Sequence, residues 1–291
     1  GMMTADPRLT SNARIIPQIS YQEAMELSHF GAKVIYPPTI QPVMGKGIPV
    51  WIKNTFAPAD EGTLIESVTR KDGDIVRGIS SINNIALISL EGSGMIGIPG
   101  FSKRLFEALS SEKINVILIT QSSSEHSICV GIDTLLAEKA RQAVDAAFAN
   151  EIALQKVEPL KTETGLSIVA LVGENMKNHT GVSGRMFSAM GRNGVNVRAI
   201  AQGSSEKNIS AVIATKDVRK AINVLHEEFF ETTYKQVNIF ITGTGNVGAK
   251  LLGQLQKQID FLQQQMHLQV NVVGLSNSRK MLIDEAGINL N

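Results

Sequence analysis

Two polar octapeptides carry glutamines at positions where a small molecule could bind. Residues 121–128 read Gln-Ser-Ser-Ser-Glu-His-Ser-Ile, and residues 202–209 read Gln-Gly-Ser-Ser-Glu-Lys-Asn-Ile. A glutamine amide offers both a donor and an acceptor, so Gln121 and Gln202 could each bind a polar ligand. A solvated hairpin tip is the alternative interpretation. Such a tip drifts readily after duplication, so finding the glutamine twice favours binding.

The spacing of 81 residues continues beyond the octapeptides without a gap. A long gapless self-match indicates a duplicated structural unit. The same offset pairs identical residues upstream: Gly100 with Gly181, Ser102 with Ser183, Arg104 with Arg185, Phe106 with Phe187, and Asn115 with Asn196.

Each copy is predicted to contain a strand, a glycine-rich loop, a helix, two strands and a second helix. Apolar periodicity places the strands at 85–90, 116–120 and 128–132, and again at 167–172, 195–201 and 209–215. The helices are expected at 101–110 and 134–149, and again at 185–192 and 217–230. One closing strand, which a neighbouring module could lend, completes the ferredoxin-like pattern. The expected fold class is α/β (α+β) with two βαββαβ modules.

These elements would place the first helix of each copy beside the strand that ends in the glutamine. Free N–H groups at a helix start attract a carboxylate, and a glutamine amide can bind a hydroxyl. The pattern therefore favours a small zwitterion that carries a hydroxyl. RNA recognition by the sheet is rejected, because residues 116–120 and 195–201 contain no aromatic side chain for stacking.

A second kind of chemistry is indicated by Gly243-Thr-Gly-Asn-Val-Gly248. An apolar strand leads into this motif and a helix follows it, which is the context of a dinucleotide-binding turn. Ser276 and Arg279 follow the next strand, where an NAD-selective site usually has an acidic residue, so NADP is favoured over NAD. We expect the truncated unit to have no dehydrogenase activity by itself. The expected cofactor-binding residues are Gly243, Gly245, Asn246, Val247, Gly248, Ser276 and Arg279.

Composition argues against several partners. The net charge of +1 gives no basic footprint for nucleic acid, and no apolar run is long enough to cross a membrane. The single cysteine, Cys129, is expected to be a buried structural thiol in a reducing, cytoplasmic protein. The five histidines show no metal-ligand spacing, so no metal site is predicted.

The N-terminal motifs complete a resemblance to a known family. Thr4-Ala-Asp-Pro-Arg8 and Gly31-Ala-Lys-Val34 resemble the end of an aspartokinase catalytic domain, and between these two motifs Ser20 and Glu23 form a predicted capping box. The repeat resembles paired ACT regulatory modules, and the glycine motif resembles the start of a homoserine dehydrogenase domain. In this order they resemble the bifunctional aspartokinase/homoserine dehydrogenases. The expected domains are 1–70 (kinase end), 71–160 and 161–234 (ACT modules), and 235–291 (truncated dehydrogenase start).

The resemblance implies specific sites. Arg8, Lys33 and Val34 would contact ATP, although Tyr36 and Pro38 stand where the family often has histidine and arginine. The implied effector is L-threonine. Its implied contacts are Ile119, Gln121 and the weaker candidate Asn115 in one copy, and Ile200, Gln202 and the weaker candidate Asn196 in the other.

The resemblance also implies the activities of a parent enzyme. The parent would phosphorylate L-aspartate with Mg-ATP, reduce aspartate semialdehyde with NAD(P)H, and form a homodimer or higher oligomer through its ACT modules. Two alternatives stay open. One is the regulatory half of a monofunctional aspartokinase, and the other is a structural linker that binds no ligand.

Overall fold

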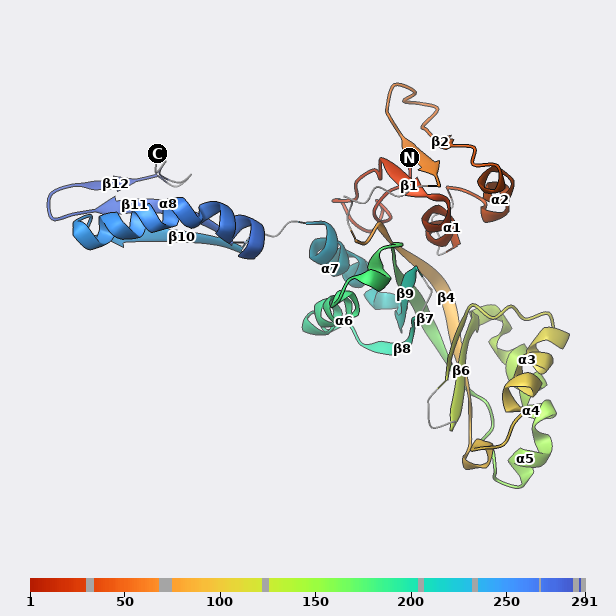
Figure 1. The fold of residues 1–291 in the computed structure, drawn as a ribbon. Helices are drawn as coiled ribbons and strands as arrows, with labels where there is room; N and C mark the ends of the chain where they lie inside the picture. Colours follow the sequence, from red (N-terminus) through yellow and green to blue (C-terminus); the bar gives the residue numbers. More distant parts are fainter. Residues whose placement is uncertain are drawn as a thin grey trace. The chain divides into compact units, whose positions relative to one another are not determined.

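The computed structural model describes residues 1–29, 34–67, 75–121, 126–203, 207–231, 235–266, 268–284 and 288. It divides into two compact units, residues 1–230 and residues 231–291, and each is described by itself (Figure 1).

A six-stranded sheet of order β5-β6-β4-β7-β9-β8 forms the centre of the first unit (Figure 1). The strands are β4 (Gly78–Glu91), β5 (Leu118–Gln121), β6 (Ser127–Asp133), β7 (Lys161–Val172), β8 (Val197–Ala201) and β9 (Asn208–Ala214). The first copy of the repeat supplies helices α3 (Phe101–Ser111), α4 (Ala137–Ala147) and α5 (Ala149–Ala153), and the second copy supplies α6 (Val182–Arg192) and α7 (Val218–Phe230). Short 3₁₀ turns lie at Ser93–Met95, Thr134–Leu136, Met176–Asn178 and Thr215–Asp217.

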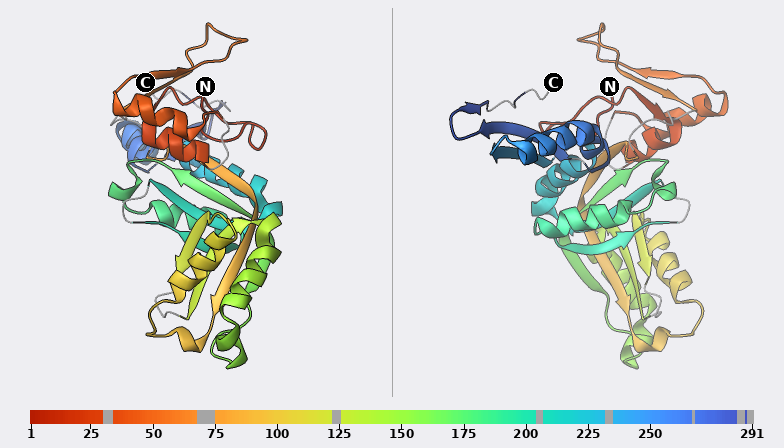
Figure 2. Two further views of the ribbon diagram at one scale, coloured as in Figure 1. Left: turned by 90° about the vertical axis from the view of Figure 1, so that its right-hand side faces the viewer. Right: turned by 60° about the vertical axis from the view of Figure 1, so that its left-hand side comes forward.

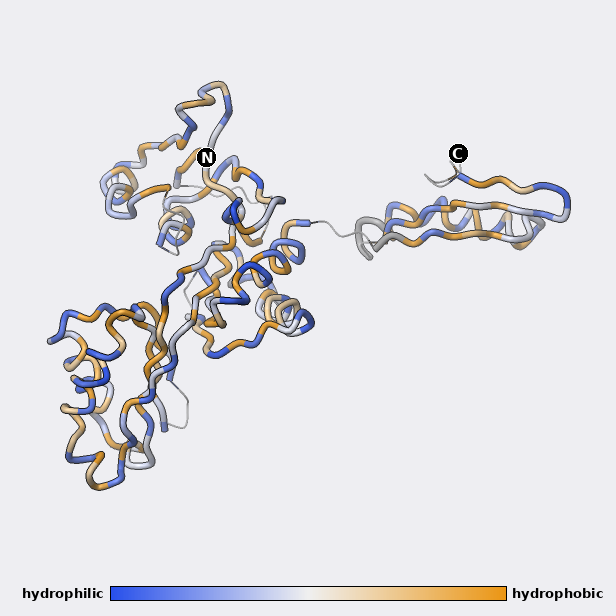
Figure 3. Tube along the Cα trace, turned by 180° about the vertical axis from the view of Figure 1, so that it is seen from behind, coloured by the Kyte–Doolittle hydropathy of each residue, from blue (hydrophilic) through white to orange (hydrophobic). Residues whose placement is uncertain are grey.

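Each pair of helices covers the strands of its own copy. Helices α3 and α4 pack side by side (Figure 2), and Leu105 and Val144 are buried in one cluster with Val130 of β6. In the second copy, Met186 and Leu225 belong to a separate buried cluster. Hydrophobic and hydrophilic residues alternate along both the strands and the helices (Figure 3), as amphipathic elements packed on a sheet require.

The two longest strands, β4 and β7, are shared by both copies. Residues 85–91 of β4 pair with β6, residues 166–172 of β7 pair with β9, and β4 and β7 pair with each other along both halves. Each copy therefore completes its four-stranded sheet with half a strand from the other copy. This arrangement confirms the ferredoxin-like prediction, including the lent strand.

The ladder between β4 and β7 is symmetric about its centre. Ile85 pairs with Leu166, its own equivalent 81 residues later. Beside this pair, Asn84 (φ 61°) and Gly165 (φ 72°) adopt a left-handed backbone conformation at equivalent positions of the two copies. The pairing register of β4 with β7 shifts between residues 82 and 85. Such bulges bend and twist a strand, so each half of the strand can follow a different copy.

The N-terminal segment, residues 1–67, forms a small three-stranded sheet of order β1-β3-β2 with two helices. Helix α1 begins with the predicted capping box. The Ser20 N–H donates to the Glu23 carboxylate, and the Glu23 N–H donates to the Ser20 hydroxyl, each at 3.1 Å. Ile19 and Leu27 are buried beneath it. The elements are β1 (Gln18–Ser20), α1 (Tyr21–His29), α2 (Pro37–Gly45), β2 (Val50–Ile52) and β3 (Thr63–Glu66).

The second unit is one parallel βαβ unit followed by an antiparallel strand. Its elements are β10 (Lys235–Thr242), α8 (Asn246–Met266), β11 (Leu268–Ser276) and β12 (Met281–Ile283), and the strand order is β10-β11-β12. Among the described residues of the whole chain, no helix combines the length and the apolar character that a bilayer crossing requires.

Candidate functional site

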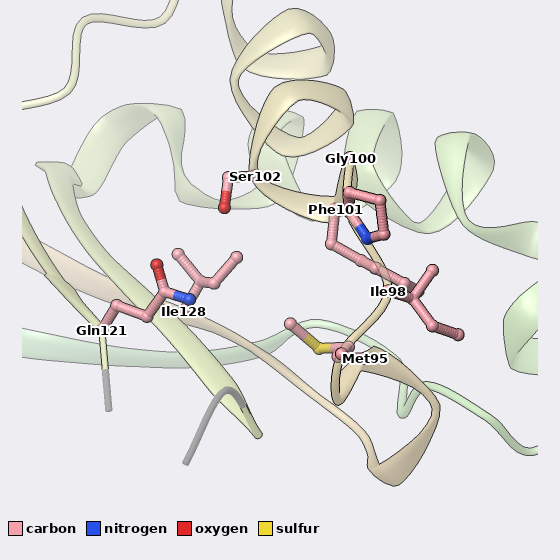
Figure 4. Close-up of a pocket in the computed structure, with 9 residues that line it drawn as sticks. Met95, Ile98, Gly100, Phe101, Ser102, Gln121 and Ile128 are labelled. Carbon is pink, nitrogen blue, oxygen red and sulfur yellow. The ribbon is translucent and has the colours of Figure 1, made fainter. Parts of the chain in front are cut away.

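The first corner consists of the loop 92–100, the start of α3 and the end of β5. These segments enclose a hollow of about 310 Å³. Figure 4 shows the Gln121 amide and the Ser102 hydroxyl pointing into the same space, with Met95 and Ile98 across from them. The sequence predicted Gln121 for this position, and the structure adds Ser102 to it.

Backbone geometry opens the start of α3 towards this hollow. Gly100 precedes the helix with φ 105°, a left-handed conformation that favours glycine, and its position carries no side-chain cap. The first N–H groups of α3, from Phe101 onwards, have no carbonyl of their own helix to bind. Together with the helix dipole they favour a bound carboxylate.

The second corner repeats these residues in a different state. It consists of the loop 173–181, the start of α6 and the end of β8. Gly181 precedes α6 with φ 85°. The Ser183 hydroxyl donates to Gln202 Oε1 at 3.0 Å, so serine and glutamine bind each other across this corner.

The other predicted effector residues lie on or just before the same two strands, and all four are exposed. Ile119 and Ile200 point from the outer strands with 53% and 44% of their surface exposed. Asn115 and Asn196 lie, exposed, in the turns before these strands. Although Ile119 and Asn115 are both within the described residues, neither lines the hollow of the first corner.

An arginine clasp, absent from the predicted sites, joins the helices of each copy. The Arg104 guanidinium forms an ion pair with Glu151 at 2.6 Å, donates to the Ala147 carbonyl at 2.6 Å, and lies 4.3 Å from the Phe148 ring centre. The pairing lowers the pKa of the Glu151 carboxyl. The clasp holds the helix that starts at the corner against its partner helix.

The same clasp recurs in the second copy. Arg185 pairs with Glu228 at 2.9 Å and lies 4.6 Å from the Phe229 ring centre. The sequence signal was present, because the offset of 81 relates both the arginines and the phenylalanines. Without the structure, nothing showed that these residues touch.

Two of the three predicted ATP-contacting residues line one hollow. Arg8 and Val34 border a space of about 470 Å³ together with Asp6, Ser80 and Ile222. Arg8 is 85% exposed and pairs with Asp6 at 2.7 Å, and this hydrogen bond lowers the pKa of the Asp6 carboxyl. Lys33 lies outside the described residues.

The glycine motif forms a tight turn between β10 and α8. Gly243 has φ 95°, and its N–H donates to the Ser276 carbonyl at 2.8 Å, which places Ser276 beside the turn. A Cβ on Gly248 would lie 2.1 Å from the Gly243 carbonyl oxygen, whereas Gly245 faces open space. Asn246 and the two residues after it begin α8. This glycine cradle at a helix start fits a dinucleotide pyrophosphate.

Arg279 lies in the turn that connects β11 to β12. The Asn277 side-chain oxygen accepts from the backbone N–H groups of Arg279 and Lys280 at 2.8 Å each. The turn therefore presents two basic residues, Arg279 and Lys280, shortly after Ser276, and basic side chains at this place suit the 2′-phosphate of NADP.

Metal binding and cysteine reactivity have little support among the described residues. Within the described ranges, no group of three or more His, Cys, Asp or Glu side chains is arranged to hold a metal ion. Cys129 is partly buried, and burial raises the pKa of its thiol, which disfavours the reactive thiolate.

Comparisons with known proteins define the class. The ACT domain family matches residues 88–148 and 169–229, and the amino acid kinase family matches residues 1–54. The crystal structure of Clostridium acetobutylicum aspartate kinase superposes with a TM-score of 0.72 at 31% identity, covering 79% of this chain and 52% of that chain. Escherichia coli aspartokinase III in complex with aspartate and ADP gives 0.66 at 30%, covering 79% and 50%. The protein is a tandem ACT regulatory region joined to part of an aspartokinase domain.

Relatives identified by sequence similarity match the whole chain, including the second unit. The bifunctional aspartokinase/homoserine dehydrogenase of Haemophilus influenzae is 41% identical over 290 residues, covering 100% of this chain and 35% of the relative. The chloroplastic enzyme of Daucus carota is 38% identical over 297 residues, covering 100% and 32%. The chain belongs to the bifunctional aspartokinase/homoserine dehydrogenases as their regulatory region, and it spans about one third of the length of these relatives.

Proposed function

We propose that the chain senses L-threonine at its ACT corners as the feedback region of a bifunctional enzyme. The observation that carries the proposal is the recurrence of one polar set, Ser102 with Gln121 and Ser183 with Gln202, each beside an uncapped helix start. The helix start would bind the carboxylate of the amino acid, and the glutamine amide would bind its hydroxyl.

The lining of the first corner supports threonine over lysine. The structural relative aspartokinase III of E. coli has been solved in complex with lysine and aspartate, so lysine is the natural competitor. Among the described residues that line the hollow, none is acidic, and a second ammonium group would lack a charged partner there.

The two corners are expected to differ in affinity. In the first corner, Gln121 faces a hollow that a ligand can enter directly. In the second corner, a ligand must first separate Ser183 from Gln202. Since breaking that hydrogen bond subtracts from the free energy of binding, we propose that the first corner binds threonine more tightly.

We also propose two activities for the parent enzyme. The parent enzyme would phosphorylate L-aspartate with Mg-ATP, with Arg8, Lys33 and Val34 among its nucleotide contacts. It would also reduce aspartate semialdehyde with NAD(P)H. The turn from Gly243 to Gly248, with Ser276 and Arg279, would hold NADP. The domain limits would be 1–70 for the kinase end, 71–160 and 161–234 for the ACT modules, and 235–291 for the dehydrogenase start. The ACT modules would join copies of the chain into an oligomer. The protein would function in the cytoplasm or an equivalent reducing compartment.

A comparison of threonine with valine tests the effector assignment. Valine replaces the threonine hydroxyl with a methyl group of similar size, and a site that hydrogen-bonds the hydroxyl rejects such an analogue strongly. Calorimetric titration should show threonine binding at least about a hundredfold tighter than valine binding, with lysine and methionine as further controls. Equal affinity for threonine and valine would refute the glutamine contact, and absence of any binding would support the structural linker.

A further inference from the structure

The loops of the two corners are anchored by different parts of the chain. In the first loop, the N–H of Gly94 donates to the Lys156 carbonyl at 2.9 Å, which lies in the same copy of the repeat. In the second loop, the N–H of Glu174 donates to Glu23 Oε1 at 2.9 Å. Glu23 belongs to α1 of the N-terminal segment, 151 residues earlier. The second corner is therefore tied directly to the kinase part of the chain.

Glu23 is a buried carboxylate with partners in three segments. Only 1% of its surface is exposed. One oxygen accepts from the Glu174 N–H and lies 3.8 Å from Nε of Arg77, just before β4. The other oxygen accepts from the Ser20 N–H at 3.1 Å at the start of α1. A buried charge that loses a partner is strongly destabilising, so these three segments are constrained to move together.

Further hydrogen bonds hold α1 against the second copy. Glu26 Oε2 accepts from the Asn208 side chain at 2.8 Å, at the start of β9. The Leu27 carbonyl accepts from the Ser80 hydroxyl at 3.3 Å, in β4. Five residues after α1 ends at His29, Val34 lines the hollow that contains Arg8. Helix α1 thus lies between the second corner and the proposed nucleotide contacts.

We propose that Glu23 is a positioning residue that transmits the state of the second corner to α1 and to the nucleotide contacts that follow it. Separating Ser183 from Gln202 frees the start of α6 and the loop before it. Glu23 follows that loop because its Oε1 accepts from the Glu174 N–H inside the loop. The regulatory meaning of this link rests on the proposed effector role, whereas the link itself does not.

The link can be tested on the whole chain without any ligand. Gln202→Ala opens the second corner, and Gln121→Ala is the matched change in the first corner, 81 residues earlier. Backbone amide resonances of residues 20–29 in NMR spectra should shift in Gln202→Ala and stay in place in Gln121→Ala. Glu23→Gln should move the Glu174 amide resonance upfield, because the charged acceptor is replaced by a neutral one. In a Glu23→Ala background, which removes the acceptor of the Glu174 N–H altogether, the effect of Gln202→Ala on α1 should be lost.

Two outcomes would overturn the proposal. In one, Gln202→Ala leaves α1 unshifted or shifts it no more than Gln121→Ala does. This comparison needs no change at Glu23, so it decides the matter even if Glu23→Ala does not fold. In the other, the α1 shifts persist in the Glu23→Ala background. Threonine titration of the same samples tests the effector role separately, since it can fail while the Gln202→Ala comparison succeeds.

Discussion

Gly248→Ala is expected to disrupt the dinucleotide turn, whereas Gly253→Ala in the same helix is not. A Cβ at residue 248 would lie 2.1 Å from the oxygen and 3.1 Å from the carbon of the Gly243 carbonyl. Both are backbone atoms, so α8 must move away from the turn to make room. A Cβ at residue 253 would meet nothing within 4 Å.

The two substitutions make the same chemical change, which cancels most of their effect on the unfolded chain. Overpacking of the kind expected at Gly248 costs roughly 1–3 kcal/mol and occasionally more. Alanine in place of a helical glycine stabilises by about 0.5–1 kcal/mol, which is the expectation for Gly253. The two variants should therefore differ by about 1.5–4 kcal/mol in the free energy of unfolding of the second unit.

Urea unfolding measured by two probes distinguishes the units. Circular dichroism reports helix in both units, whereas fluorescence of Trp51, the single tryptophan, reports the first unit alone. Gly248→Ala should lower the circular dichroism midpoint of the second unit and weaken NADPH binding, and leave the Trp51 transition unchanged. Equal midpoints and equal NADPH affinities for Gly248→Ala and Gly253→Ala would refute the close-packing argument.

Three further predictions follow from single contacts. The Arg104 guanidinium lowers the pKa of Glu151, so their ion pair stabilises the protein at a pH above the ordinary glutamate pKa of about 4.3 and loses this contribution as the pH falls through the lowered pKa. Arg104→Met should therefore lower the free energy of unfolding at pH 7 and lower it less at low pH. An effect of Arg104→Met that does not change with pH would contradict this prediction. Because Asn84 in β4 has a left-handed backbone conformation, Asn84→Val should lower the free energy of unfolding by about 1–2 kcal/mol. Asn84→Gly should leave the melting temperature unchanged or raise it. Equal melting temperatures for the two variants would argue against backbone strain at this position. Ser183→Ala should strengthen threonine binding at the second corner, as seen by calorimetry, because Gln202 no longer has to leave Ser183, and weaker binding would instead make the serine a ligand contact.

The repeat allowed most of the first unit to be predicted from the sequence. Helix α3 was expected at 101–110 and is observed at Phe101–Ser111. Strand β7, expected at 167–172, begins six residues earlier at Lys161. Residues 161–165 are polar and exposed, so they show no apolar pattern. Their place in the sheet depends on pairing with β4, which local sequence does not encode.

The difference between the two corners could not be predicted, because their key residues are identical. Ser102 and Gln121 border an open hollow, whereas Ser183 and Gln202 bind each other. The sequence also identified Glu23 only as a helix cap. Its second oxygen is used by a residue far along the chain, and such a contact is visible only after folding.

Calorimetric titration of this chain with L-threonine, repeated with Gln121→Ala and Gln202→Ala, tests the central claim most directly. We expect binding to the wild-type chain at two unequal sites, with the tighter site lost in Gln121→Ala and the weaker site lost in Gln202→Ala. Absence of threonine binding, or binding that neither substitution changes, would contradict it.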